Sequence, residues 1–188
     1  MGVVVGYLAS FSEHVYQATM RILPVEPHHI PALSQLAIET FKETFGHLYP
    51  PEDLSAFLIK SYAPAQLAIE LADPTQFWRI VYEGDAVAYL QCGPVSLPHP
   101  EANPANAGEL KRLYVHSSQQ GKGLGKMLLT IAMNWMTETY PGNPQWIGVW
   151  SQNHKAQSLY GAYGFERVGA YQFAVGKTLD DEFILRRS

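Results

Sequence analysis

The chain has 188 residues, of which 47% are hydrophobic and 16% are charged, and its formal net charge is −4. This length suits one domain with a substantial buried core, and the composition excludes an intrinsically disordered chain. No run of Lys or Arg exceeds two adjacent residues, so the sequence does not support a nucleic-acid partner. A mildly acidic protein is instead compatible with a small cationic partner.

Residues 1–19 are interpreted as an N-terminal extension, and residues 20–188 as a single domain. The first basic residue is Arg21, so the apolar start lacks the charged beginning of a secretory signal. The apolar run is also too short to cross a bilayer, and no membrane association is predicted. The only cysteine, Cys92, lies in an apolar run and is predicted to be a buried structural thiol in a reducing, cytoplasmic compartment. The seven histidines show no metal-binding spacing, and His28 and His29 are expected to be solvated.

The spacing of apolar residues and the positions of proline and glycine predict helices in the first third of the chain. Residues 20–25 are typical of a strand, and residues 31–45 carry a helical apolar stripe that ends at Gly46. Two further helices are predicted to begin at Pro50 and at Pro64, because proline suits the first turn of a helix.

The remaining segments alternate between strands and helices. Strands are expected over residues 77–82, 86–92, 110–115, 145–150, 165–175 and 179–187. Helices are expected to begin at Leu124 and to span residues 153–163, while the proline-rich residues 94–107 form a loop. This order predicts a mixed α/β layered domain.

Three glycines at alternate positions, Gly121, Gly123 and Gly125, connect the strand at 110–115 to the following helix. A glycine-rich turn at a helix start exposes backbone N–H groups at the positive end of the helix dipole and lets a phosphate approach the backbone. A dinucleotide fingerprint would need glycine where Lys126 stands, and a P-loop would need glycine at Gln120 and a hydroxyl residue at Met127. From these residues alone, a phosphate site and a plain solvent loop remain open.

Two motifs resemble the GNAT superfamily of acyl-CoA-dependent N-acetyltransferases. One is Gln120-x-x-Gly123-x-Gly125, and the other is the ungapped segment from Asn153 through Ala156, Tyr160 and Gly164 to Phe165. The resemblance covers nearly everything from Met20 onward. It implies a three-layer α/β fold with a mixed, mostly antiparallel central sheet flanked by helices, and acetyl-CoA as donor substrate without a metal.

Several shorter stretches are similar to the branch of PaiA-type polyamine acetyltransferases. They are Thr40-Phe41-x-x-Thr44-Phe45, Glu52-Asp53-Leu54, Glu70-Leu71-x-Asp73-Pro74 and Ile147-Gly148-Val149-Trp150. The N-terminal extension and residues 178–181 depart from the branch. The resemblance therefore favours a polyamine-like acceptor, although residues 178–181 belong to the hairpin that helps to wall the acceptor cleft in such folds.

The resemblance implies a cofactor site and two catalytic side chains. Tyr160 would return a proton to the departing sulfur, with packing on an amphipathic helix as the alternative. Glu109 would take the proton of the amine, with simple solvation as the alternative, and Glu109→Gln would then shift the pH profile of kcat/KM to higher pH. Asn153 would bond the pantetheine arm, cap its helix, or do both. The residues expected to hold coenzyme A are Leu113, Tyr114, Val115, Gln120, Gly121, Lys122, Gly123, Leu124, Gly125, Lys126 and Asn153.

Acceptor recognition is the least determined part of the sequence. Carboxylates at Glu39, Glu43, Glu52, Asp53 and 180–182 would suit a polycation, although solvated helix faces explain them equally well. The leading hypothesis is direct attack by a small primary amine in a ternary complex. Another amine (an amino acid, an aminoglycoside-like amine or a protein N-terminus) and a non-catalytic CoA sensor are the alternatives. A homodimer is left open.

Overall fold

The computed structural model describes residues 20–188, so the predicted extension over residues 1–19 lies outside the described part of the chain. The helices are α1 (Ile30–Phe45), α2 (Pro51–Tyr62), α3 (Pro64–Ala72), α4 (Leu124–Thr139) and α5 (His154–Ala162). The strands are β1 (Arg21–Pro24), β2 (Phe77–Glu83), β3 (Asp85–Pro94), β4 (Gly108–Val115), β5 (Gln145–Trp150), β6 (Glu166–Val175) and β7 (Thr178–Arg187). Short 3₁₀ turns cover Pro27–His29 and Ser117–Gln119. The segments agree with the sequence prediction to within a few residues at their ends.

The seven strands form one sheet in the order β1-β2-β3-β4-β5-β7-β6. Every neighbouring pair is antiparallel except β4 and β5, which run parallel. The predicted mixed, mostly antiparallel sheet is therefore confirmed. The parallel pair stands at the centre of the order, between two antiparallel groups.

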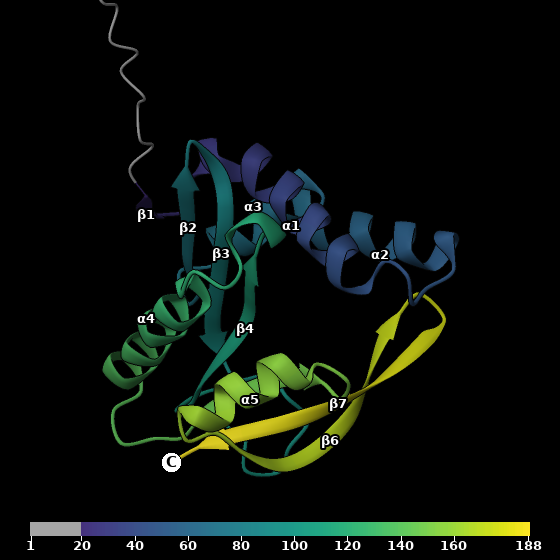
Figure 1. Ribbon diagram of the computed structural model, residues 1–188. Coiled ribbons are helices and arrows are strands. Elements are labelled where there is room, and N and C mark those ends of the chain that lie inside the picture. Colours follow the sequence, from purple (N-terminus) through teal and green to yellow (C-terminus); the bar gives the residue numbers. More distant parts are fainter. Residues whose placement is uncertain (1–19) are drawn as a thin grey trace, which may run out of the picture.

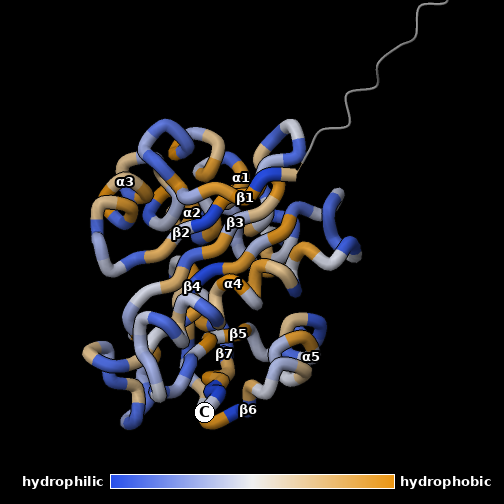
Figure 2. Tube along the Cα trace, turned by 90° about the vertical axis from the view of Figure 1, so that its left-hand side faces the viewer, coloured by the Kyte–Doolittle hydropathy of each residue, from blue (hydrophilic) through white to orange (hydrophobic). Residues whose placement is uncertain are grey.

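Helices cover both faces of the sheet and produce three layers (Figure 1). On one face α1, α2 and α3 bury residues such as Leu36, Phe41 and Leu67 against Ile80 and Tyr89. On the other face α4 and α5 pack against a separate core that includes Leu128 and Tyr160. Figure 2 shows hydrophobic stretches running through the strands and helices, with hydrophilic stretches at the outer turns.

Two predictions about single residues have different outcomes. Cys92 is fully buried, and burial raises the pKa of its thiol, so the structural interpretation is confirmed. The expectation that His29 is solvated was wrong: the ring is only 8% exposed, and its Nδ1 accepts a hydrogen bond from the Glu26 backbone N–H. Burial lowers the pKa of His29, the neighbouring His28 lowers it further, and the ring caps the turn that begins α1. Within residues 20–188, no helix has the length and apolar character needed to cross a bilayer.

Candidate active site

The parallel strands β4 and β5 separate in the middle of the sheet. They pair only from Gly108 with Gln145 to Leu110 with Ile147. A bulge beside Lys111 shifts the register of β4 against β3, and from Arg112 to Val115 β4 pairs with β3 alone. Past the bulge, the edge of β4 that faces β5 offers its main-chain groups to a ligand, and this edge includes Leu113, Tyr114 and Val115.

A cleft of about 1470 Å³ occupies this separation. Its walls include Leu113, Tyr114 and Val115 from β4, and Gly148 and Trp150 from β5. The cleft also reaches residues from both helical layers, so it passes through the sheet between β4 and β5 and can be approached from either face. Such an opening allows two substrates to meet from opposite sides.

The glycine turn forms one mouth of the cleft. Gly121 and Gly123 have φ of +81° and +86°, a left-handed conformation that glycine adopts without strain. α4 begins directly afterwards, and its first internal backbone bond runs from the Met127 N–H to the Gly123 carbonyl. The N–H groups of residues 124–126 therefore have no partner within the helix. A Cβ built on any of the three glycines meets nothing within 4 Å, which leaves room for a diphosphate against the backbone.

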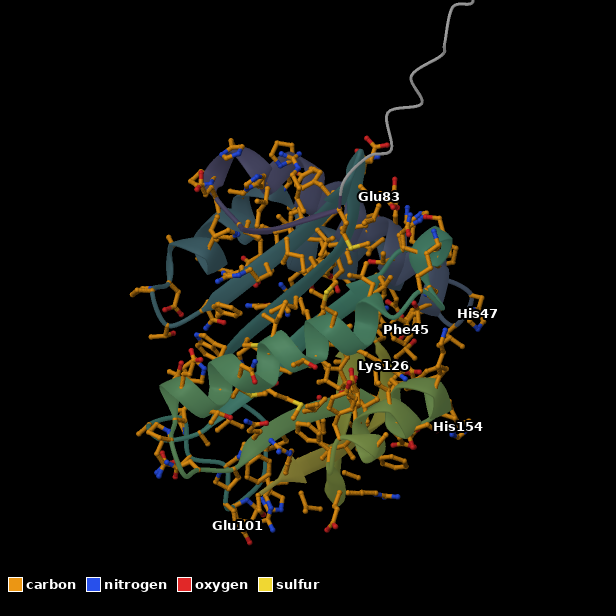
Figure 3. All side chains as sticks on the ribbon, turned by 60° about the vertical axis from the view of Figure 1, so that its left-hand side comes forward. Phe45, His47, Glu83, Glu101, Lys126 and His154 are labelled. Carbon is orange, nitrogen blue, oxygen red and sulfur yellow. The ribbon has the colours of Figure 1, made fainter. Side chains whose placement is uncertain are left out.

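The side chains around the turn differ in whether they line the cleft. Gln120 donates to the Val115 carbonyl at 3.1 Å and accepts from Lys155 of α5 at 2.9 Å, which links the turn to both neighbouring elements. Lys126 and Lys155 line the cleft, and Figure 3 shows Lys126 near the start of α4 on the side of α5. Lys122 does not line the cleft, since its ammonium group donates to Gln119 at 2.8 Å. The side chain of Leu124 is buried in the core, so only its backbone can contribute.

Tyr160 and Asn153 extend from α5 into the same cleft. Asn153 caps the helix, because its side chain accepts a hydrogen bond from the Ala156 N–H at 3.1 Å. Tyr160 is 8% exposed, and its hydroxyl makes no hydrogen bond to another of residues 20–188. Burial raises the pKa of Tyr160 to about 12, so the phenol keeps its proton at neutral pH.

Glu109 lies on the opposite side of the cleft and is 7% exposed, so it is not the solvated strand-entry residue that the sequence left open. Its Oε2 accepts from the Ser96 N–H at 2.7 Å, from the Ser96 hydroxyl at 2.9 Å and from Lys111 at 3.1 Å. This carboxylate therefore holds the loop after β3 onto β4 and has a cation beside it.

Two phenol–carboxylate pairs also line the cleft. The Tyr49 hydroxyl donates to Asp180, and the Tyr171 hydroxyl donates to Glu182. Burial raises the pKa of Glu182, and the nearby charges of Asp180 and Glu109 act in the same direction. Sequence reasoning did not single out Tyr171, although the alternation of Asp180 and Glu182 along β7 was a signal that both share one face.

A further ion pair borders the cleft on the face of the sheet that α1, α2 and α3 cover. Arg112 of β4 contacts Glu70 of α3 at 2.7 and 3.4 Å, and its guanidinium lies 5.2 Å from the ring centre of Tyr62. Gln91 also donates to Glu70 at 3.3 Å. This network fixes α3 to β4 where β4 leaves β5. Motifs and spacing did not indicate this network, because its members are far apart in the chain.

The two sets of side chains occupy opposite faces of the sheet. Tyr160 belongs to the core formed with α4, whereas Tyr49 and Tyr114 pack with α1–α3. The arrangement brings a protonated phenol and a phosphate-sized turn to one face, and paired carboxylates to the other. Chemically, it can hold an anionic donor and a cationic acceptor at one opening. Residues 20–188 contain no group of three or more His, Cys, Asp or Glu placed to hold a metal ion, and independence from metals stays a prediction.

Comparisons with known proteins agree with this geometry. The model of the acetyltransferase (GNAT) family matches residues 30–165. An uncharacterized N-acetyltransferase in the pepI 3′ region of Lactobacillus delbrueckii subsp. lactis is 30% identical over 170 residues, covering 90% of this chain and 97% of its own length. The spermine/spermidine N(1)-acetyltransferase of Bacillus subtilis is 29% identical over 103 residues, covering 55% of this chain and 67% of its own length.

Two solved structures show the same fold at low sequence identity. The PaiA N-acetyltransferase of Thermoplasma acidophilum, in complex with coenzyme A, superposes with a TM-score of 0.71 at 19% identity, covering 90% of this chain and 99% of its own. The ribosomal-protein-S18-alanine N-acetyltransferase of Escherichia coli superposes with a TM-score of 0.64 at 16% identity, covering 90% of this chain and 93% of its own. The fold is therefore shared with a protein whose name gives an alanine of a ribosomal protein as the acceptor, so the fold alone does not identify the acceptor of this chain.

Proposed function

The chain belongs to the acetyltransferase (GNAT) family, and from this premise we propose that it transfers an acetyl group from acetyl-CoA to a primary amine of a small, polyamine-like cation. The transfer is a direct attack within a ternary complex. The donor enters at the glycine turn on the α4–α5 face, and the amine enters on the face of α1 and α2.

A cationic acceptor is favoured by the charge of the second mouth of the cleft, the opening on the face of α1 and α2. Its lining includes the carboxylates of Glu109, Asp180 and Glu182. Among residues 20–188, Glu109 is the one of the three that is paired with a cation, the ammonium group of Lys111. Asp180 and Glu182 accept bonds from the Tyr49 and Tyr171 hydroxyls, and no Lys or Arg among residues 20–188 forms an ion pair with either. Protonated amines are attracted to such a surface. The polyamine acetyltransferase of Bacillus subtilis supports the same choice through partial similarity.

The residues of the turn fit the donor. Its phosphates need closely approaching backbone donors, which the glycines at 121, 123 and 125 allow. Asn153 and the free edge of β4 from residue 113 to 115 would hold the pantetheine arm, and a backbone N–H of that edge would stabilise the charge on the carbonyl oxygen. When bound, acetyl-CoA supplies the acyl group as a reactive thioester.

Tyr160 is proposed as the general acid. Its hydroxyl lines the cleft and keeps its proton, because burial raises its pKa to about 12. As the carbon–sulfur bond breaks, the developing thiolate takes this proton, and the phenolate is reprotonated afterwards. A phenol held neutral in this way suits protonation of a thiolate at physiological pH.

The test is thiol release from acetyl-CoA over a panel of amines: spermidine, spermine, an amino acid, an aminoglycoside and a peptide with a free N-terminus. The assay reports only the cofactor thiol, since Cys92 is fully buried with a raised pKa. We expect the highest kcat/KM with spermidine or spermine. Preference for another amine would keep the acetyl transfer and contradict the polyamine assignment. Binding of coenzyme A without thiol release for any amine would favour a non-catalytic sensor.

A further inference from the structure

Of the carboxylates on the acceptor side, Glu109 already has several partners. Its Oε2 accepts from two Ser96 groups and from the Lys111 ammonium. The ion pair with Lys111, at 3.1 Å, places a cation directly on this oxygen. An oxygen that already accepts three bonds, one of them from a cation, has little hydrogen-bonding capacity left for a ligand.

Glu182 is held differently. Within residues 20–188 it accepts one hydrogen bond, from the Tyr171 hydroxyl, and no Lys or Arg forms an ion pair with it. It lies on β7, opposite Trp150 of β5 and opposite Tyr171 of β6. The carboxylate lines the cleft and keeps hydrogen-bonding capacity for a ligand.

Gly148 brings this pair to the opening between β4 and β5. A Cβ built at Gly148 would lie 2.9 Å from the Tyr171 hydroxyl and 3.3 Å from Oε2 of Glu182. The missing side chain therefore lets both polar groups reach β5 one residue past Ile147, where pairing with β4 has ended. At this point the acceptor nitrogen would approach the thioester carbon from the face opposite Tyr160.

We propose that Glu182, oriented by Tyr171, is the general base of the acetyl transfer proposed above. Its carboxylate takes a proton from the acceptor ammonium, and the freed lone pair forms the bond to the thioester carbon. The carbon–sulfur bond then breaks, and sulfur takes the proton of Tyr160. The nitrogen loses its second proton to solvent as the amide forms, and solvent returns one proton to Tyr160. Glu182 then releases its proton to solvent, so each turnover releases one net proton. Tyr171 is a positioning residue in this scheme.

The groups that face Glu182 have opposite effects on its basicity. Burial raises its pKa most, and the negative charges of Asp180 on β7 and Glu109 on β4 raise it too, whereas the bond from Tyr171 on β6 lowers it. Tyr49 and Lys111 lie one step further out, bonded to Asp180 and Glu109. A carboxylate with a raised pKa is a stronger base near neutral pH than a surface glutamate.

The test compares the pH profile of kcat/KM, measured with the best amine of the panel, in the wild type, Glu182→Gln, Tyr171→Phe and Glu109→Gln. Glu182→Gln should lower kcat/KM at neutral pH by about 10²-fold or more, and the remaining activity should rise with pH as free amine appears. Tyr171→Phe should move the acidic limb to higher pH, because the bond that lowers the pKa of Glu182 is lost.

Glu109→Gln separates the two candidate bases. If Glu182 is the base, removal of a neighbouring negative charge lowers its pKa, so the acidic limb should move to lower pH. If Glu109 is the base, this variant should lose the limb or move it to higher pH, and the proposal for Glu182 would be wrong. Wild-type kcat/KM and an unchanged limb in Glu182→Gln would also overturn it.

Affinity for coenzyme A and the melting temperature show whether each variant is folded. If Glu182→Gln does not fold, the opposite shifts expected for Tyr171→Phe and Glu109→Gln decide the question, and shifts in one direction or none contradict the proposal. A wild type that acetylates no amine would contradict the proposed function. An active wild type with a normal Glu182→Gln variant would contradict only the base assignment.

Discussion

The two sides of the cleft are built from the chain in different ways. The proposed donor side comes from one stretch of the chain, in which β4 leads through the glycine turn into α4, and Tyr160 follows on α5 after β5. The acceptor side combines Tyr49 between α1 and α2, Glu109 on β4, Tyr171 on β6 and Glu182 on β7. A site made of neighbouring residues can be recognised as a motif, whereas a site made of distant residues exists only after folding. The difference predicts which substitutions affect every amine equally and which depend on the amine.

The largest effect on the donor side is expected for Tyr160→Phe. Loss of the proton donor should lower kcat by about 10²-fold or more. The factor should be the same for every amine with which the chemical step limits the rate. Stability should change little, because the hydroxyl bonds no other residue among 20–188. Tyr163→Phe, at the residue that directly follows α5, is the matched control, since Tyr163 does not line the cleft.

The pH dependence of kcat provides a second test of Tyr160. The acid form of Tyr160 is required, and its pKa is raised to about 12, so wild-type kcat should show no alkaline decline up to about pH 10. A phenol with an ordinary pKa would be half ionised there. A fall in kcat centred near pH 10, absent from Tyr160→Phe, would contradict the buried acid.

A smaller effect is expected for Gly123→Ala. The alanine must adopt φ of +86°, which costs about 1–2 kcal/mol of stability, and its methyl group points into the space left for the diphosphate. We expect the Kd for coenzyme A to rise roughly tenfold or more, the equivalent of one lost bond to a charged group.

Gly84→Ala is the control for backbone strain. Gly84 has φ of +75° and equally open surroundings, but it lies in the hairpin between β2 and β3. Both variants should therefore lose similar stability, as measured by denaturant unfolding, and only Gly123→Ala should bind coenzyme A more weakly. Equal affinities would place the phosphate site elsewhere.

The smallest effects concern the lysines around the turn. Lys126→Ala and Lys155→Ala should each raise the Kd for coenzyme A by about 1.4- to fivefold at low salt, because exposed charges contribute about 0.2–1 kcal/mol. Lys122→Ala should change it less, since Lys122 is bonded to Gln119 and does not line the cleft. Titration calorimetry at two salt concentrations measures both the difference and its screening. A larger loss for Lys122→Ala would contradict this placement of the side chains.

The sequence predicted most of the fold, because each segment carries its own local signal. The apolar stripe of α1, the prolines that begin α2 and α3, and the glycines that precede α4 mark their elements without knowledge of distant contacts. His29 was misjudged because its burial depends on strands and helices that are remote in the chain, including the Tyr82 ring at 5.8 Å. The network around Arg112 escaped notice for the same reason.

The sequence alone was sufficient to predict two features of the proposed donor side: a glycine turn that leaves backbone donors free, and a tyrosine two helical turns after an asparagine. Short-range backbone geometry is sufficient for both features. Tertiary structure decided the acceptor side, where β-sheet register places Glu182 beside Tyr171 and opposite Trp150. Register and burial set which carboxylate meets a cation and which meets only a phenol. Because both depend on the whole sheet, composition and spacing do not contain that information.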